Sequence, residues 1–275
     1  MPGGRQDRKA VSGMVDEHHS RPSKNLAPIE GDQAARSSKL AVGHRRLRPS
    51  VMIMTKVVLN FKTYSEATGA EALKLSRICE EAKDQYDVEI AVAVQAPDIR
   101  LISENVSIPV YAQHVDGVGF GGFTGSITAA AVKAAGATGT LINHSERRLR
   151  LAEIEASLSA CRAAGIASIV CTNNVPTTRA AASLKPDYVA VEPPELIGSG
   201  IPVSKADPGI VTGSVEAVKR IEPSVGVLCG AGISRGEDLR AALDLGSEGV
   251  LLASGIVKAK DQKAALEDLL SGIRR

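Results

Sequence analysis

An acidic residue, Glu192, stands where a short apolar run meets two prolines. The run at 188–191 is too short for a globular helix and is rich in residues that favour strands. Pro193 has no N–H to donate to a sheet, so the chain must leave the strand directly after Glu192. The glycines within 198–200 suit the hinge of a lid. We therefore interpret this stretch as a strand, a candidate general base and a lid, although a solvated glutamate followed by an ordinary loop fits the same residues.

Two further side chains are suited to proton transfer beside a carbonyl group. His144 follows an apolar run and precedes Ser145 and Glu146, which could begin a short helix whose N–H groups disfavour an imidazolium. A neutral imidazole could polarise a carbonyl. Lys62 lies two residues after Asn60 and would supply positive charge for a phosphate or an enolate. The alternatives are a buried structural histidine and a solvated surface lysine.

Small residues in two late stretches predict a phosphate site. Residues 230–234 read Gly-Ala-Gly-Ile-Ser, and 253–255 read Ala-Ser-Gly. Backbone N–H groups of such residues can approach an anion closely, and in barrels the loops after the seventh and eighth strands often bind phosphate. Ordinary turns have the same composition, but both loops show it. The ligand expected here is therefore a phosphorylated small molecule.

Short apolar runs alternate with helical patterns along most of the chain, and these elements must position the polar residues. Runs that are apolar on both faces, each followed by a helix, argue for a parallel sheet, and eight of them favour a closed barrel. The open, doubly wound sheet is the second choice, because no Gly-x-Gly-x-x-Gly follows the first run. The expected strands are 56–60, 88–94, 110–113, 139–143, 167–172, 188–191, 225–229 and 249–253, and the expected helices include 71–86, 128–135, 154–164, 214–221, 237–245 and 259–273.

A closed barrel predicts where the chemistry lies, because its active site is built from loops at the carboxyl ends of the strands. Lys62, His144 and Glu192 all follow the ends of expected strands. His114 also follows one, but no comparable motif surrounds it, so we interpret it as a buried structural histidine. The polar residues are therefore expected to converge on one rim of an α/β, (β/α)8 barrel.

Composition divides the chain near residue 53. Residues 1–50 carry ten Lys and Arg against five Asp and Glu, whereas the remainder carries 23 against 26. We expect 1–53 to be a disordered basic leader, and a start at Met52 or Met54 would make it a gene-start artefact. No basic cluster interleaved with aromatics supports a nucleic-acid-binding arm. Residues 54–275 suit one catalytic barrel domain.

Other features exclude some classes of protein. No run of about 18 apolar residues predicts a membrane span. The four cysteines lack Cys-x-x-Cys spacing, and we expect reduced, mostly buried thiols in a cytoplasmic protein. Neither the histidines nor the cysteines have metal-ligand spacing, so no metal and no cofactor are expected.

Three motifs in chain order resemble the signatures of the triosephosphate isomerase family: Asn-Phe-Lys at 60–62, His-Ser-Glu-Arg-Arg at 144–148, and Glu-Pro at 192–193 leading to Ile-Gly-Ser-Gly at 197–200. The likeness runs from about residue 56 to about 260. It implies the TIM-barrel fold and interconversion of dihydroxyacetone phosphate and D-glyceraldehyde 3-phosphate through an enediolate, in glycolysis and gluconeogenesis. That family's paired glutamate and neutral histidine are a known example of pKa tuning.

The resemblance also implies roles for individual residues. Catalytic roles fall to Glu192 as the base, His144 as the electrophile, and Lys62 with Asn60 stabilising the oxyanion. Ser145 and Glu146 are implied to support the site from outside it. The residues implied to bind substrate are Asn60, Phe61, Lys62, Ile197, Gly198, Gly232, Ala253 and Ser254.

The sequence departs from many family members in the lid, which reads Pro-Pro-Glu at 193–195, and in the two phosphate loops. We interpret Glu195 as lid surface. These departures, with Asn143 before the histidine, resemble the compact archaeal branch, which implies a homo-oligomer, a tetramer rather than a dimer. The alternatives are another phosphate-binding barrel enzyme, such as an aldolase or sugar-phosphate isomerase, and a non-catalytic protein that binds phosphorylated metabolites.

Overall fold

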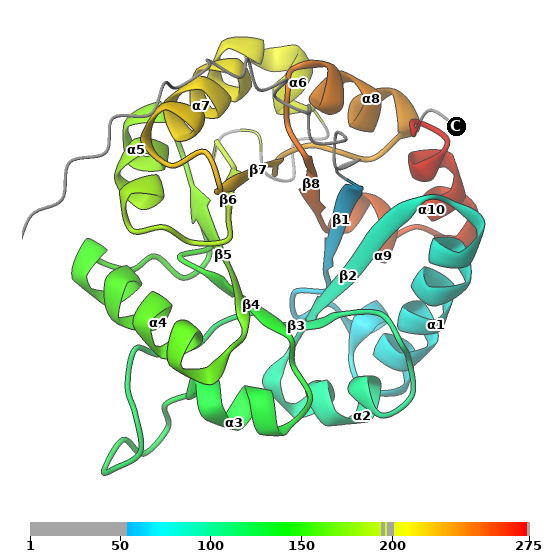
Figure 1. Ribbon diagram of the computed structural model, residues 1–275. Helices are drawn as coiled ribbons and strands as arrows, with labels where there is room; N and C mark the ends of the chain where they lie inside the picture. The colour runs from blue at the N-terminus through cyan, green and yellow to red at the C-terminus, as the bar shows by residue number, and fades with distance from the viewer. Residues whose placement is uncertain (1–53, 194–195, 197–200, 274–275) are drawn as a thin grey trace, which may run out of the picture. The chain divides into compact units, whose positions relative to one another are not determined.

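A closed barrel of parallel strands forms the centre of the computed structural model, which describes residues 54–193, 196 and 201–273. Within these residues each strand pairs with its neighbours in sequence, and the last pairs with the first (Figure 1). The strands are β1 (Thr55–Asn60), β2 (Val88–Val94), β3 (Val110–Ala112), β4 (Gly139–Ile142), β5 (Ala167–Thr172), β6 (Tyr188–Val191), β7 (Gly226–Cys229) and β8 (Gly249–Leu252). Every strand begins and ends within one residue of the prediction.

Closure of the barrel depends on the pairing of β1 with β8, in which Lys56 lies opposite Gly249. A Cβ atom at residue 249 would lie 1.8 Å from the carbonyl oxygen of Lys56. Real side chains do not approach backbone so closely, so this position requires glycine. The first and last strands therefore meet without a side chain between them.

Helices surround the barrel, as Figure 1 shows. The α-helices are α1 (Ala70–Gln85), α2 (Ile99–Ser103), α3 (Ala129–Ala134), α4 (Leu151–Ala164), α5 (Val175–Ser183), α6 (Val203–Ala206), α7 (Pro208–Ile221), α8 (Gly236–Asp244), α9 (Ser254–Val257) and α10 (Gln262–Leu270), with 3-10 turns η1 (Ser65–Ala67) and η2 (Ala96–Asp98). The structure adds α2, α5, α6 and α9 to the expected helices. Among the described helices none is long and apolar enough to cross a membrane.

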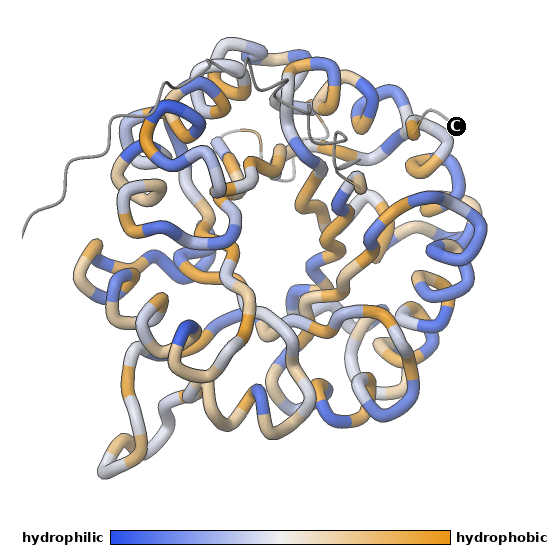
Figure 2. The backbone as a smooth tube through the Cα atoms, viewed as in Figure 1, coloured by the Kyte–Doolittle hydropathy of each residue, from blue (hydrophilic) through white to orange (hydrophobic). Residues whose placement is uncertain are grey.

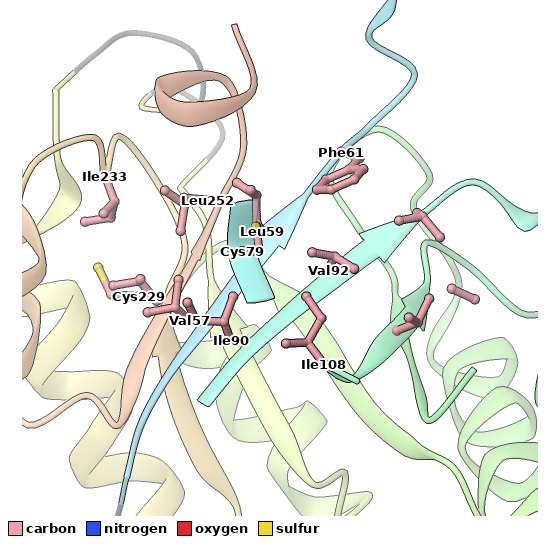
Figure 3. Close-up of a cluster of buried hydrophobic side chains, with 14 of the residues drawn as sticks. Val57, Leu59, Phe61, Cys79, Ile90, Val92, Ile108, Cys229, Ile233 and Leu252 are labelled. Carbon is pink, nitrogen blue, oxygen red and sulfur yellow. The ribbon is translucent and has the colours of Figure 1, made fainter. Parts of the chain in front are cut away.

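Two apolar clusters hold the described barrel together. The smaller lies inside the barrel and includes Ala91, Leu141 and Leu228. The larger fills the layer between strands and helices, where Phe61 and Ile90 lie fully buried (Figure 3). Hydrophobic residues accordingly follow the strands and the inward sides of the helices (Figure 2). Successive side chains of a strand point alternately into these two apolar clusters. Polar side chains are therefore accommodated mainly at the ends of the strands.

A lysine fills the interior at the end of the barrel where the strands begin. Lys56 is 4% exposed, and its Nζ lies 6.0 Å from the ring centre of Tyr111 and 4.9 Å from that of Tyr188. It also pairs with the partly exposed carboxylate of Glu89. Aromatic faces attract cations electrostatically. The buried ammonium of Lys56 is therefore stabilised by these partners. It lies at the end of the barrel opposite to the one where the sequence predicts the active site.

Candidate active site

A pocket lies at the carboxyl ends of the strands, where the sequence predicts the chemistry. Its volume is about 110 Å³. Segments that follow β1, β4, β6, β7 and β8 contribute to it, so residues almost 200 positions apart share one cavity. The lining residues are Asn60, Lys62, Tyr64, His144, Glu192, Gly230, Ala231, Gly232, Ile233, Ser234, Leu251, Leu252, Ala253, Ser254 and Gly255.

Glu192 leaves β6 directly into this pocket. Its N–H donates to the carbonyl of Thr172 at 2.7 Å, which extends the sheet by one residue before Pro193 ends it. The residue is only 4% exposed, and its Oε2 has no hydrogen-bond partner among the described residues. A Cβ at residue 230 would lie 2.4 Å from Cγ of Glu192, so the carboxylate occupies space that only glycine leaves open.

Burial raises the pKa of the Glu192 carboxyl from 4.5 to about 7. The Cys171 thiol and the positive charges of Lys62 and Arg148 oppose this rise in pKa. Desolvation outweighs them because the low-polarity surroundings disfavour the charged form. A carboxyl with this pKa can both accept and release a proton near neutral pH.

His144 faces Glu192 across the pocket, with Nε2 3.7 Å from Oε1 of the carboxylate. The N–H of Glu146 donates to Nδ1 of the imidazole at 3.2 Å. Burial, followed by the positive charge of Lys62, lowers the pKa of His144 to about 4. The ring is therefore neutral at pH 7, and because Nδ1 accepts a hydrogen bond, we assign its proton to Nε2, the nitrogen that faces the pocket.

Lys62 brings the positive charge into the pocket. Its Nζ donates to Oε1 of Glu146 at 2.8 Å, and its side chain is 12% exposed. The backbone has a φ of +49°, the left-handed region, and it is held there by two contacts. The N–H of Lys62 donates to Oδ1 of Asn60 at 3.0 Å, and Nε2 of Gln113 donates to the carbonyl of Lys62 at 2.7 Å.

The loops after β7 and β8 supply small residues to the same pocket, including Gly232, Ala253 and Ser254. Gly232 has a φ of +71°, and a Cβ there would lie 2.0 Å from the carbonyl oxygen of Ile201. Asp238 fixes the rest of the first loop, since its Oδ2 accepts from the N–H of Ser234 at 3.1 Å. Backbone can therefore approach a ligand closely on this side.

Some predicted residues lie elsewhere. Phe61 is fully buried in the layer between strands and helices and does not line the pocket (Figure 3), because it alternates with Asn60, which faces inward. Ser145, which was expected to support the site from outside it, is partly buried and does not line the pocket. Most of the predicted lid, including Glu195, Ile197 and Gly198, lies outside the described residues.

The other histidine among the described residues and the four cysteines lie where they were predicted. His114 is buried and bonds Asp116 Oδ1 through Nε2 at 3.0 Å. All four cysteines are buried and unpaired. The described residues contain no group of three or more His, Cys, Asp or Glu side chains placed to hold a metal ion.

Sequence reasoning assigned no structural role in the site to the side chains of Gln113 and Asn143, and it did not predict that Glu192 requires glycine at residue 230. Gln113 and Asn143 stand at the ends of expected strands, which was the available signal, but their partners become known only from the packing. The requirement for glycine at 230 arises from the neighbouring strand. Such contacts leave no trace in local sequence.

A (β/α)8 barrel with polar side chains converging at the carboxyl ends of its strands defines an enzyme of the TIM-barrel class. The family model described as triosephosphate isomerase matches residues 55–271, most of the chain. The chain belongs to the triosephosphate isomerase family.

Individual relatives agree with this assignment. The chain is 66% identical over 192 residues to "Triosephosphate isomerase" of Methanosarcina barkeri, covering 70% of this chain and 86% of the relative. It is 65% identical over 215 residues to the protein of that name from Methanococcoides burtonii, covering 78% and 97%. The crystal structure of triosephosphate isomerase from Bartonella henselae superposes with a TM-score of 0.62 at 20% identity, covering 78% of this chain and 98% of that one, which shows the common fold. The chain is accordingly an isomerase of glycolysis that interconverts triose phosphates.

Proposed function

We propose that Glu192 is the general base of this isomerisation. In the direction from dihydroxyacetone phosphate, the carboxylate takes a proton from the hydroxymethyl carbon, and the electron pair forms an enediolate. The carboxyl then returns the proton to the neighbouring carbon, giving D-glyceraldehyde 3-phosphate. The observation that carries this role is a buried carboxylate with an unpaired oxygen and a pKa of about 7, beside a neutral imidazole.

His144, Lys62 and Asn60 act on the substrate oxygens in this proposal. The Nε2–H of His144 donates to the oxygens at the two carbons between which the proton moves, and a neutral ring avoids a mismatch with the weakly acidic enediol. The ammonium of Lys62 offsets the negative charge of the substrate and the enediolate. The side-chain amide of Asn60 lies near Lys62, and its Oδ1 accepts a hydrogen bond from the N–H of Lys62. The Nδ2 group of Asn60 is therefore the donor available to the substrate oxygen.

The phosphate group is proposed to lie against the loops after β7 and β8. Gly232, Ala253 and Ser254 line that side of the pocket, and their N–H groups can reach phosphate oxygens without interference from bulky side chains. The Nζ of Lys62 adds a positive charge within the same cavity. Isothermal titration with inorganic phosphate tests this assignment, with Gly232→Ala expected to weaken binding and Gly213→Ala, on α7, expected to leave it unchanged.

The test of the base is the kinetics of Glu192→Gln, which keeps the shape of the side chain and removes its basicity. We expect kcat to fall by about 10²-fold to 10⁴-fold or more. Binding of inorganic phosphate should be nearly unchanged, because Glu192 does not contact the phosphate in this proposal. Turnover equal to that of the unmodified chain would reject Glu192 as the base. The exposed Glu216→Gln, on α7, is the matched control.

Self-association is a further part of the proposal, with a tetramer rather than a dimer. The support is a loop between β3 and α3 that projects from the barrel in Figure 1, where Phe120 is 92% exposed. A second cavity of about 320 Å³ adjoins the active-site pocket and shares Asn60, Lys62 and His144 with it, and Gln95, Pro97 and His114 are among its other lining residues. The aromatic tip on one copy could bury itself in the cavity of another. Sedimentation equilibrium should show smaller species for Phe120→Ser than for the unmodified chain.

The catalytic unit is proposed to be residues 54–275, in the cytoplasm. The proposal also places the chain in the archaeal-type branch of the family, which is supported by its 66% identity to the relative from Methanosarcina barkeri. The family match begins at residue 55, and a compact unit comprises Ser50–Arg275. A chain beginning at Met54 should retain the kcat of the full chain. Activity that requires the leader would contradict this boundary.

A further inference from the structure

Asn143 occupies the junction between β4 and the segment that carries His144. Its φ is +61°, in the left-handed region where asparagine is one of the few favoured non-glycine residues. The residue is 5% exposed and is not among those lining the active-site pocket. It therefore has no direct access to substrate, yet it sets the direction in which the chain leaves β4.

The side chain of Asn143 joins three parts of the structure. Its Nδ2 donates to the carbonyl of Cys171 on β5 at 2.8 Å. Its Oδ1 accepts from the N–H of Leu149 at 2.8 Å. The Asn143 carbonyl accepts from Nη1 of Arg148 at 3.1 Å. The turn 143–149 is thus closed at both ends and attached to the barrel wall, and His144 and Glu146 lie within it.

Glycine, aspartate and alanine would each lack part of what asparagine provides at this position. Glycine permits the positive φ but makes neither side-chain bond. Aspartate can accept from Leu149, yet it has no donor for the Cys171 carbonyl. Alanine supplies neither bond and is strained at positive φ. In a buried place, a donor or acceptor left without its partner is costly, so the turn would shift to satisfy it.

We propose that Asn143 is a positioning residue for His144, acting through the closed turn. The turn holds the imidazole so that Nδ1 meets the N–H of Glu146 and Nε2 lies 3.7 Å from Glu192. This inference rests on the electrophilic role proposed above for His144. A displaced ring would stabilise the developing oxyanion less well, while the phosphate loops on the other side of the pocket would still bind substrate.

The experiment measures kcat and KM of the full chain for Asn143→Gly, Asn143→Asp, His144→Gln and the double variant Asn143→Gly with His144→Gln. For Asn143→Gly we expect kcat to fall by about tenfold or more with KM changed by less than about threefold. Asn143→Asp keeps the hydrogen bond from Leu149, so its kcat should lie between those of the unmodified chain and Asn143→Gly. In the His144→Gln background, Asn143→Gly should change kcat by less than about twofold, because the group that it positions is gone.

Asn174→Gly is the matched control. Asn174 also follows a strand at the same rim, and its Oδ1 accepts from the N–H of Thr177 at 2.9 Å, but it lies outside the pocket lining and the 143–149 turn. It should lower Tm with little change in kcat. Nitrogen-15 NMR of labelled histidine adds a direct reading, since Asn143→Gly and Asn143→Asp should move the His144 ring signals and Asn174→Gly should not.

Two outcomes would overturn the proposal. One is a wild-type kcat and unmoved His144 signals in both Asn143 variants, and the other is an equal loss of kcat with and without His144. Failure of the underlying assignment looks different, because His144→Gln would then itself turn over at the wild-type rate. A collapse of activity in His144→Gln beside an active Asn143→Gly would reject only the role of Asn143.

Discussion

The imidazole Nε2 of His144 lies 3.7 Å from Oε1 of Glu192. Burial shifts the pKa values of these two groups in opposite directions. Desolvation raises the pKa of the carboxyl to about 7 and lowers that of the imidazole to about 4. Both groups thereby favour their neutral forms. The pocket can hold a reactive carboxylate beside an uncharged hydrogen-bond donor, the combination that proton transfer next to a carbonyl requires.

These shifts predict the pH dependence of the reaction. Because Glu192, the proposed base, must be ionised to accept a proton, kcat/KM of the full chain should fall as the pH drops below about 7, approaching a tenfold loss per pH unit. His144 should stay neutral until about pH 4 and add nothing in this range. The measurement is kcat/KM from pH 5 to 9, with the substrate's own phosphate titration followed by phosphorus NMR. A profile that is flat between pH 5.5 and 8 after that correction would contradict the prediction.

The same carboxyl should make the fold less stable at high pH. A folded pKa of about 7, above the ordinary 4.5, means that the neutral acid suits the fold. Its stabilising effect relative to the ionised form is complete below pH 4.5 and is lost as the pH rises through 7. At pH 8 we expect Glu192→Gln to be more stable than the unmodified chain by on the order of 3 kcal/mol, since one pKa unit is about 1.4 kcal/mol.

Urea unfolding at pH 5 and pH 8, at one fixed protein concentration, measures this difference. The gain from Glu192→Gln should shrink toward zero at the lower pH. Glu216→Gln removes an exposed carboxylate on α7 and should show no comparable dependence. An equal gain at both pH values would point to packing and not to ionisation.

Gly230→Ala should damage catalysis without unfolding the barrel. The added Cβ would lie 2.4 Å from Cγ of Glu192 and 3.1 Å from the Val191 carbonyl oxygen. Since the carboxylate must move, we expect kcat to fall by about 10²-fold, the loss typical of a displacement near 1 Å. Circular dichroism should remain native. Gly213→Ala, on α7, is the control, because its new methyl meets only the end of a valine side chain at 3.3 Å.

Lys56→Met should separate stability from catalysis. The change removes the cation held between Tyr111 and Tyr188 while keeping an unbranched chain of similar length. We expect the free energy of unfolding to fall by about 1–2 kcal/mol through loss of the contacts between the cation and the two rings. The value of kcat should be unchanged, because the residue lies at the opposite end of the barrel from Glu192. A lower kcat in Lys56→Met would reveal coupling between the two ends.

Much of the fold could be predicted from the sequence, because strands buried on both faces are continuous apolar runs. The helix α5 escaped prediction since its residues carry Pro176 and two threonines, and its signal was the capping Asn174. The helix α7 begins six residues earlier than expected, where Asp207 caps it and Pro208 occupies its first position. Single-turn helices such as α6 and α9 have too few residues to show a period.

The candidate site followed from the sequence as far as residue type and strand end could indicate it. Glu192, His144, Lys62 and Asn60 meet in one pocket, whereas Phe61 points into the outer layer because neighbouring strand residues face opposite ways. The left-handed backbones of Lys62 and Asn143 were not predicted, since each is maintained by partners distant in sequence.

The pairing of the first strand with the last has a consequence for biosynthesis. Asn60 ends β1 and Lys62 follows it, while Ala253 and Ser254 follow β8, so the two sides of the pocket are translated almost 200 residues apart. Until residue 249 has left the ribosome and docked against Lys56, the sheet is open and the pocket lacks a wall. A nascent chain therefore carries Glu192 and His144, the proposed base and electrophile, before the pocket is complete. Activity should appear only after synthesis has passed the eighth strand.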